Sequence, residues 1–223
     1  MKMRKSFTLA EVLITLSILG VIAVIAIPNL VQKYQRRALK TKLVKAYSDI
    51  EHVSRVFYLT HEMSIPDYAR TANGGYNYIN VFNDIIDGQY IKISSTKEQN
   101  INNSSFFCNT YKNLTDGSPS SSIFGNGYIK DGKGRDWFAQ YAYDTLAVDI
   151  NGSEKGPNKF GIDVFAFYFE NNGEVKPADN LNRCAKKSIN ASNGLYCTKY
   201  ALQNIYPAGN SNKNYWTDFL NSD

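Results

Sequence analysis

The longest apolar stretch of the chain lies close to its N-terminus. Between Phe7 and Leu30 the sequence reads FTLAEVLITLSILGVIAVIAIPNL, and Glu11 is the only charged residue within it. About 20 apolar residues in an α-helix, each rising about 1.5 Å, are enough to cross the hydrocarbon core of a bilayer. The pattern therefore predicts one membrane-spanning helix over residues 7–30.

Beyond this stretch, apolar positions recur every three or four residues. They are Leu39, Leu43, Ala46, Ile50, Val53 and Phe57. This spacing places them on one face of a helix, so residues 31–60 are predicted to form an amphipathic helix that continues the first. Pro28 is predicted to bend the helix because proline has no N–H to donate. Ile65-Pro66-Asp67 is predicted to end the helical propensity.

The last third of the chain has the pattern of short strands. Apolar and aromatic residues gather in the segments 138–143, 146–150 and 163–169. The turn-forming segments 131–134 and 170–173 are predicted hairpin turns, and the second precedes a strand at 174–176. Residues 100–122, rich in Asn, Ser and Thr, are predicted to be a loop. An antiparallel meander packed on the second half of the long helix gives an α+β fold class.

Charge is distributed unevenly along the chain. Of its 223 residues 25 are basic and 20 acidic, but Lys2, Arg4 and Lys5 precede the apolar run, so 22 basic residues face 20 acidic ones elsewhere. A balance this small gives no electrostatic reason to expect nucleic-acid binding. The basic end is expected to stay in the cytoplasm while the rest is exported.

A second basic cluster follows the apolar run. It consists of Arg36, Arg37, Lys40, Lys42 and Lys45. Such a cluster would contact anionic lipid headgroups, or DNA, or simply form a solvated helix face, and we favour the solvated face.

Three other interpretations of the apolar run compete with a membrane-embedded assembly helix. A secretory signal peptide has a shorter apolar run and a small-x-small cleavage site, which Ile25-Ala26-Ile27-Pro28 does not provide. A buried core helix fits neither the length nor the basic flank. A plain membrane anchor does not explain Glu11, because a carboxylate in the bilayer costs a few kcal/mol and needs a partner. Cleavage between Ser6 and Phe7 would create an amino group close to Glu11, on the same or a neighbouring chain.

These residues match a known pattern. The segment Lys5-Ser6-Phe7-Thr8-Leu9-Ala10-Glu11-Val12-Leu13, with the apolar run and Pro28, resembles the prepilin-type cleavage and methylation motif. Its family comprises type IV pilins, type II secretion pseudopilins and related competence proteins. The resemblance implies cleavage between Ser6 and Phe7 by a prepilin peptidase and N-methylation of Phe7 by the same enzyme. It also implies that Glu11 is the assembly glutamate and that Pro28 is a helix-kinking proline. The family usually has Gly before the cut, where this chain has Ser6.

The resemblance implies a pilin-like lollipop. Its parts would be a leader over residues 1–6, a transmembrane and assembly helix over 7–30, an amphipathic helix over 31–60 and a globular α/β domain over 61–223. The chain would be a single-pass protein of the bacterial inner membrane, with its C-terminal domain outside the cytoplasm and, in the filament, periplasmic or extracellular.

The implied function is that of a structural subunit of a type IV pilus or a type II secretion pseudopilus, polymerised through the N-terminal helix. Its partners would be other pilins or pseudopilins, the prepilin peptidase, the inner-membrane assembly platform and membrane lipid. The alternative is a minor, tip or competence pilin that serves as a surface- or DNA-binding module.

The sequence gives little support to catalysis. His52 and His61 are the two histidines, and His61-Glu62-Met63 lacks the second histidine of a zincin helix. A phosphate-loop pattern and a nucleophile elbow are also missing, so we do not expect an enzyme.

One group of residues has the pattern of a ligand site. Asp149, Asn151 and Asp163 place side-chain oxygens around a glycine-rich segment, as calcium requires. Some major pseudopilins carry a calcium site in a loop of their C-terminal sheet, which adds support. The alternative is a polar turn held by Asp and Asn side-chain hydrogen bonds. No other cofactor is expected.

The chain has three cysteines. In an exported domain Cys184 and Cys197 are the most economical disulfide pair, because they close a short loop. A pairing through Cys108 stays open.

Overall fold

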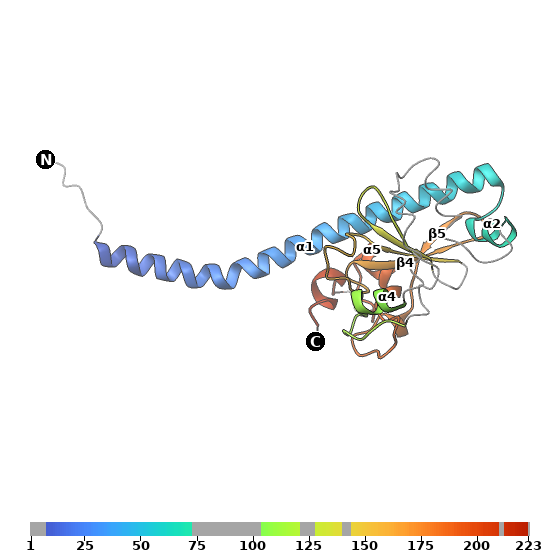
Figure 1. The fold of residues 1–223 in the computed structure, drawn as a ribbon. Coiled ribbons are helices and arrows are strands. Elements are labelled where there is room, and N and C mark those ends of the chain that lie inside the picture. The colour runs from blue at the N-terminus through green and yellow to red at the C-terminus, as the bar shows by residue number, and fades with distance from the viewer. Residues whose placement is uncertain (1–7, 73–103, 121–127, 140–143, 210–211, 223) are drawn as a thin grey trace. The chain divides into compact units, whose positions relative to one another are not determined.

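The computed structural model describes residues 8–72, 104–120, 128–139, 144–209 and 212–222 (Figure 1). Its helices are α1 (Leu9–His61), α2 (Ile65–Ala72), α4 (Ser104–Thr110), η2 (Leu181–Arg183), η3 (Leu195–Cys197), α5 (Thr198–Gln203) and η4 (Tyr215–Phe219). Its strands are β1 (Tyr128–Lys130), β2 (Asp136–Ala139), β3 (Thr145–Asp149), β4 (Val164–Phe169) and β5 (Val175–Pro177). The chain divides into an N-terminal unit, residues 1–38, and a C-terminal unit, residues 39–223.

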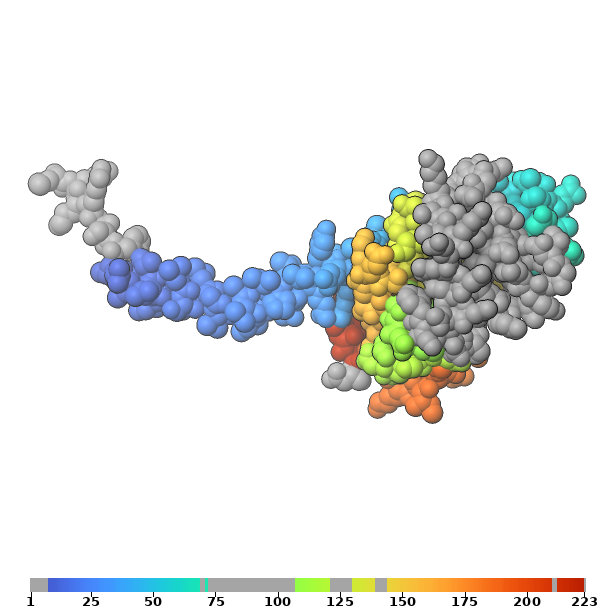
Figure 2. Space-filling view, viewed as in Figure 1, coloured from blue at the N-terminus to red at the C-terminus, as the bar shows by residue number. Residues whose placement is uncertain are grey.

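The N-terminal unit contains the first part of α1. This helix is long and apolar enough to cross a membrane, and none of its most apolar stretch is buried. Large apolar side chains from Leu9 to Val31 are exposed on it. Figure 2 draws this part of the helix in blue. The helix continues through Pro28 without interruption.

The C-terminal unit is built on a sheet. Its five strands follow the order β1-β2-β3-β4-β5, and all neighbours are antiparallel. A long helix followed by an antiparallel meander confirms the predicted α+β class.

Both predicted hairpin turns are present. The amide of Gly134 donates to the carbonyl of Asp131 between β1 and β2, and the amide of Gly173 donates to the carbonyl of Glu170 between β4 and β5. Gly173 has φ +81°, and a Cβ there would lie 2.6 Å from the Cβ of Tyr58. Glycine is therefore required both by the backbone conformation and by the close approach of α1.

Alternation along the strands separates two apolar cores. Phe165, Phe167 and Phe169 of β4 belong to the core that includes Leu43 and Ile50 of α1. The intervening residues of β4 belong to a second core on the opposite face, which contains Phe107, Tyr111, Phe138, Ala147, Phe160, Val164, Ala166, Ala178, Leu195 and Tyr196. Successive residues of a strand point to opposite faces of the sheet, and this sheet is covered on both sides. The strand β4 therefore contributes side chains to both cores.

Within the C-terminal unit, α1 packs against the sheet as the amphipathic stripe predicts. Leu43, Ala46, Ile50, Val53 and Phe57 are buried, and Leu39 packs against the same core.

Two hydrogen bonds secure β5 and the turn that precedes it to α1. Tyr47 Oη donates to the carbonyl of Val175 at 3.1 Å, and Ser54 Oγ donates to that of Gly173 at 2.8 Å. The ring of Tyr47 also stacks on Phe167, with ring centroids 5.6 Å apart.

An ion-pair network joins α1 to the β1–β2 hairpin. Arg135 Nη1 lies 2.8 Å from Asp49 Oδ2 on α1, and its Nε donates to Asp131 Oδ2 at 2.6 Å. Trp137 Nε1 donates to the same Asp131 oxygen at 2.9 Å. Burial alone would raise the pKa of Asp49, but hydrogen bonds and charges from Lys133 and Arg135 outweigh it, so the pKa is lowered. We call Asp49, Asp131 and Arg135 the hairpin clamp.

The structure corrects two expectations. Ile65-Pro66-Asp67 begins α2 rather than marking the end of helical structure. Ser64 is the cause: its Oγ donates to Asp67 Oδ2 at 2.7 Å and accepts from the amide of Asp67 at 3.2 Å. Proline is tolerated in the first turn because its missing N–H has no helical acceptor there. The predicted loop over 100–122 contains α4, whose Phe107 fills the second core.

Candidate functional sites

Three aspartates meet at one end of the sheet. Asp136 begins β2, Asp149 ends β3 and Asp163 directly precedes β4. Asp136 and Asp149 are paired across the two strands, and all three residues are fully buried. The register of β2 and β3 therefore places Asp136 beside Asp149. Asp136 thus joins Asp149 and Asp163, the two aspartates that were predicted from the sequence.

Backbone amides of the β3–β4 connection bind two of these carboxylates. Asp149 Oδ1 accepts from the amides of Asn151 and Gly152 at 3.1 and 2.9 Å. Asp163 accepts from the amides of Asn158 and Lys159 at 2.8 and 2.6 Å. The predicted residues Asp149, Asn151 and Asp163 are thus brought together, and the polar turn proposed as the alternative is also present.

Neighbouring elements complete the cluster. Tyr111 Oη donates to Asp149 Oδ2 at 3.1 Å, and the amide of Ser153 donates to Asp136 Oδ2 at 2.8 Å. The side chain of Asn151 donates to the carbonyl of Gly156 at 2.7 Å and also hydrogen bonds with Asp163.

Burial makes these carboxylates hold protons more tightly. Burial and the nearby charge of Asp163 raise the pKa of Asp149 to about 7. Burial also raises the pKa of Asp163 to about 6, against the opposing effect of its backbone hydrogen bonds.

The raised pKa values of Asp149 and Asp163 predict how the stability of the fold depends on pH. In metal-free buffer the free energy of unfolding should fall between about pH 4 and about pH 7, because the folded chain retains protons that the unfolded chain has released. Each unit of pKa difference corresponds to about 1.4 kcal/mol. Asp149→Asn removes one of the titrating groups, so its decline should be smaller. Chemical denaturation at about pH 5 and about pH 7.5 measures this, and a wild-type decline no larger than that of Asp149→Asn would contradict it.

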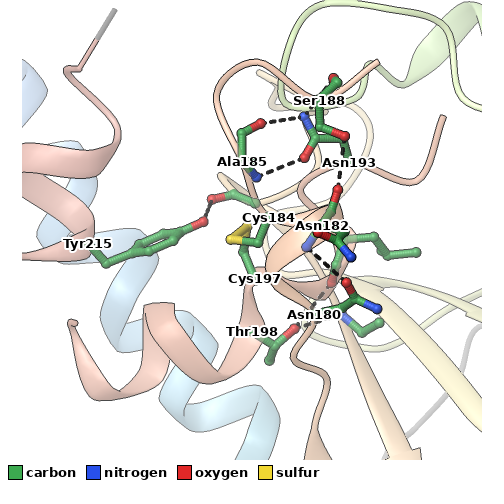
Figure 3. The surroundings of a disulfide bond; sticks show 12 residues. Asn180, Asn182, Cys184, Ala185, Ser188, Asn193, Cys197, Thr198 and Tyr215 are labelled. Carbon is green, nitrogen blue, oxygen red and sulfur yellow. Dashed lines mark hydrogen bonds between the residues drawn. A yellow bond between two sulfur atoms is a disulfide. The ribbon is translucent and has the colours of Figure 1, made fainter. Parts of the chain in front are cut away.

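A disulfide closes the loop that follows the sheet. Cys184 and Cys197 are bonded, with their Cα atoms 5.1 Å apart, which is the pair that the sequence favoured (Figure 3). Asn193 bridges the same loop: its Nδ2 donates to the carbonyl of Ala185 at 2.8 Å, and its Oδ1 accepts from the amide of Ala185 at 3.1 Å. Cys108 is free, and its Sγ donates to the carbonyl of Pro119 at 3.2 Å.

We expect Cys184→Ser to lower the free energy of unfolding by about 2–4 kcal/mol, because the disulfide restricts the unfolded chain. Cys108→Ser is the control and should change it far less, since Cys108 closes no loop. Urea denaturation of both variants provides the measurement. Equal losses in the two would contradict the structural role of the bridge.

The start of α1 has a capping box. The amide and Oγ1 of Thr8 both donate to Glu11 Oε2 at 2.8 Å, and the amide of Glu11 donates to Thr8 Oγ1 at 3.2 Å. The Thr-x-x-Glu spacing satisfies backbone donors that a helix start leaves unpaired. The sequence-based prediction gave Glu11 the Phe7 amine of the same or a neighbouring chain as its partner and overlooked Thr8, although this spacing is itself a recognisable signal. Thr8 carries no charge, so it does not neutralise the carboxylate.

Polar side chains farther along the apolar stretch bond to their own helix. Thr15 Oγ1 donates to the carbonyl of Val12 at 2.9 Å, and Ser17 Oγ donates to that of Leu13 at 2.8 Å. Each hydroxyl therefore has an acceptor that needs no water, which a helix in lipid requires.

Comparison with known families bears on this segment. The family model of the prokaryotic N-terminal methylation motif matches residues 1–27. The chain has a prepilin-type N-terminus. This is consistent with a type IV pilin or pseudopilin and supports a processed subunit of that type. No curated protein and no solved structure matches the chain.

Ser6, Phe7 and Glu11 lie within the matched segment, and Pro28 directly follows it. Ser6 and Phe7, the predicted cleavage pair, lie outside the described residues, whereas Glu11 lies in the first turn of α1 and Pro28 within the helix. The motif and the apolar helix fit a membrane-anchored, single-pass protein that assembles with other pilins after processing by a prepilin peptidase.

Proposed function

We propose that this chain is a structural subunit of a type IV pilus or a type II secretion pseudopilus. The observation that carries the proposal is the prepilin-type motif over residues 1–27, continued by an apolar helix with no buried residue in its membrane-length stretch. A helix with its whole apolar surface exposed needs either lipid or other helices around it.

Processing would prepare the helix for assembly. Cleavage between Ser6 and Phe7 on the cytoplasmic side would leave a positively charged amino group one residue before Thr8, which already binds Glu11. The hydrogen bonds of Thr8 hold the carboxylate at the helix start, and the new amine would supply the missing charge. N-methylation of Phe7 would keep that charge.

Polymerisation would then exchange lipid for neighbouring helices. An incoming Glu11 in the bilayer pays a desolvation cost of a few kcal/mol, which pairing with the Phe7 amine of a neighbouring subunit would offset. The other polar groups of the helix, such as Thr15 and Ser17, bond internally. These hydroxyls therefore lose no hydrogen bond when the helix leaves the bilayer. Glu11 is then the group that sets the register between neighbouring helices.

The C-terminal unit would lie outside the cytoplasm. Lys2, Arg4 and Lys5 would keep the N-terminus inside, and the Cys184–Cys197 bridge suits an oxidising compartment. The prepilin peptidase and the inner-membrane assembly platform would be its partners in the membrane.

Fractionation of the bacterium that makes the chain tests this role and separates the two machines. Shearing of whole cells should release the chain with surface filaments if it builds a pilus. Loss of protein secretion on deletion, with the chain kept in the periplasm and membrane, would identify a pseudopilus. The proposal would be contradicted by a chain that stays monomeric in the membrane, is not released by shearing and whose deletion leaves protein secretion intact.

The binding-module alternative remains a separate prediction. If the chain is a binding module, the purified chain in detergent should bind DNA or glycans, and its binding to DNA should be lost as the salt concentration rises. We favour the structural role, because the net charge beyond the N-terminal basic residues is small.

A further inference from the structure

A groove of about 460 Å³ lies between α1 and the β4–β5 hairpin of the C-terminal unit. Tyr47, Glu51 and Tyr58 of α1 line it from one side, and Glu174 lines it from the hairpin. The three residues of α1 share one helix face, because spacings of four, seven and eleven residues are close to whole turns. The groove is large enough to receive the side chain of a partner, since ligand pockets measure about 300–1,000 Å³.

The groove contains one negative charge that its own cations do not balance. Glu51 and Glu174 are both exposed, and neither forms an ion pair with another residue that the structure describes. Of the two cations that line the groove, Lys176 already pairs with Glu170 Oε1 at 3.2 Å. Two carboxylates therefore share Arg55, and the groove lacks one cation.

The hydroxyl of Tyr47 shows where this charge is concentrated. Burial, a hydrogen bond with Glu51 and the negative charges of Glu51 and Glu174 raise the pKa of Tyr47 to about 12. Both carboxylates thus act at the same end of the groove. A cation that entered there would be attracted by both of them.

The same face of α1 carries a matching cation nearer the N-terminus. Lys40 precedes Tyr47 by seven residues and Glu51 by eleven, so it points in their direction around the helix. It is partly exposed and forms no ion pair within the described ranges. Eleven residues of α-helix span about 16 Å, which is too far for Lys40 to reach Glu51 of its own chain.

We propose that Lys40 of one copy of the chain binds in the groove of the next copy, beside Glu51 and Glu174. The proposal rests on the proposed function, in which identical chains enter the filament in one orientation with their helices parallel. A contact between two different patches of identical chains is heterologous, and it repeats without closing in an open filament. Because each copy has both the cation and the groove that lacks one, every copy serves two neighbours.

Two exposed apolar side chains fit the same arrangement. Val44 is 47% exposed, and Leu59, which lines the groove, is 74% exposed. A shift of eleven residues between parallel helices brings Val44 of one copy level with Arg55 of the next, one turn before Leu59. Exposed apolar side chains beside polar ones are typical of protein interfaces. This contact and the Glu11 contact involve different neighbours, because a helical filament surrounds each subunit with several.

Cysteine cross-linking in intact cells tests the contact directly. The full-length chain would carry Cys108→Ser, which removes the free thiol, together with Lys40→Cys and Glu51→Cys. A disulfide needs Cα atoms within about 7 Å, whereas these positions lie about 16 Å apart on one helix, so their disulfide must join two copies. We expect a ladder of multimers on a non-reducing gel. Lys42→Cys in place of Lys40→Cys should give no ladder, because position 42 lies about 200° around the helix from position 40.

Charge reversal gives an independent measurement. Lys40→Glu and Glu51→Lys should each lower the amount of chain in filaments roughly fivefold or more, because like charges then meet at every contact. The two reversals together restore opposite charges and should return the amount to within about twofold of the wild type. Lys42→Glu is the matched control, because it makes the same charge change on another face of α1. It should stay within about twofold of the wild type, since exposed surface charges contribute little.

The behaviour of the wild-type chain separates this contact from the proposed function. If the wild type assembles but the Lys40 and Glu51 cysteine pair gives no ladder, the contact is wrong and the proposed function stands. The same holds if the combined reversal assembles no better than the single ones, or if Lys42→Cys gives an equal ladder. A wild-type chain that never assembles would contradict the proposed function and this contact with it.

Discussion

Replacing Glu11 by alanine is expected to remove the chain from filaments while leaving its insertion into the membrane intact. A carboxylate costs about 2.5–3.5 kcal/mol at the centre of a bilayer helix and less near its end, where Glu11 lies, so its loss does not hinder insertion. It does remove the charged partner of the Phe7 amine on a neighbouring subunit. We expect the amount of chain in sheared or purified filaments to fall roughly tenfold or more, which corresponds to at least about 1.4 kcal/mol per subunit contact.

Two further variants separate charge from helix capping. Glu11→Gln keeps an oxygen that accepts from Thr8 but lacks the charge, so it should fail to assemble as Glu11→Ala does. Thr15→Val removes a polar group of the same helix that bonds only to the carbonyl of Val12, and it should assemble normally. Normal assembly of Glu11→Gln would show that Glu11 acts as a cap and not as the charge that sets register.

Replacing Arg135 by methionine is expected to destabilise the C-terminal unit by about 3–5 kcal/mol. The Arg135 side chain is 5% exposed and pairs with Asp131, whose side chain is fully buried. Methionine has a similar volume but would leave the charge of Asp131 uncompensated inside the protein. Arg135 also pairs with Asp49 of α1, so the loss should loosen the helix from the β1–β2 hairpin. Urea denaturation gives the change in free energy of unfolding.

Lys133→Met provides the comparison for this variant. Lys133 Nζ lies 2.6 Å from the same Asp49 oxygen, but its side chain is 43% exposed. An exposed pair is worth about 0–1 kcal/mol, so this variant should lose far less than Arg135→Met. Similar losses in both would show that burial of the hairpin clamp does not determine its strength.

Features of the chain that depend on short spacings could be predicted from the sequence. Glu11 within the apolar run, the stripe from Leu39 to Phe57 and the nearby Cys184 and Cys197 need only neighbours in sequence. The hairpin turns at 131–134 and 170–173 likewise follow from local turn residues.

The features that the sequence missed depend on contacts between distant residues. Asp136 joins Asp149 because β2 and β3 pair in one particular register, and a register shift of one residue would point it to the other face. Arg135 reaches Asp49 across 86 positions because α1 packs on the hairpin. Two misses were local, however: Thr8 and Ser64 both cap helices with an acidic residue three positions later.

Mass spectrometry of the N-terminal peptide from the mature protein tests whether the chain is processed between Ser6 and Phe7. We predict a chain that begins at Phe7 and carries one methyl group on its amino nitrogen. A mature chain that still begins at Met1, with Ser6 and Phe7 joined, would contradict it.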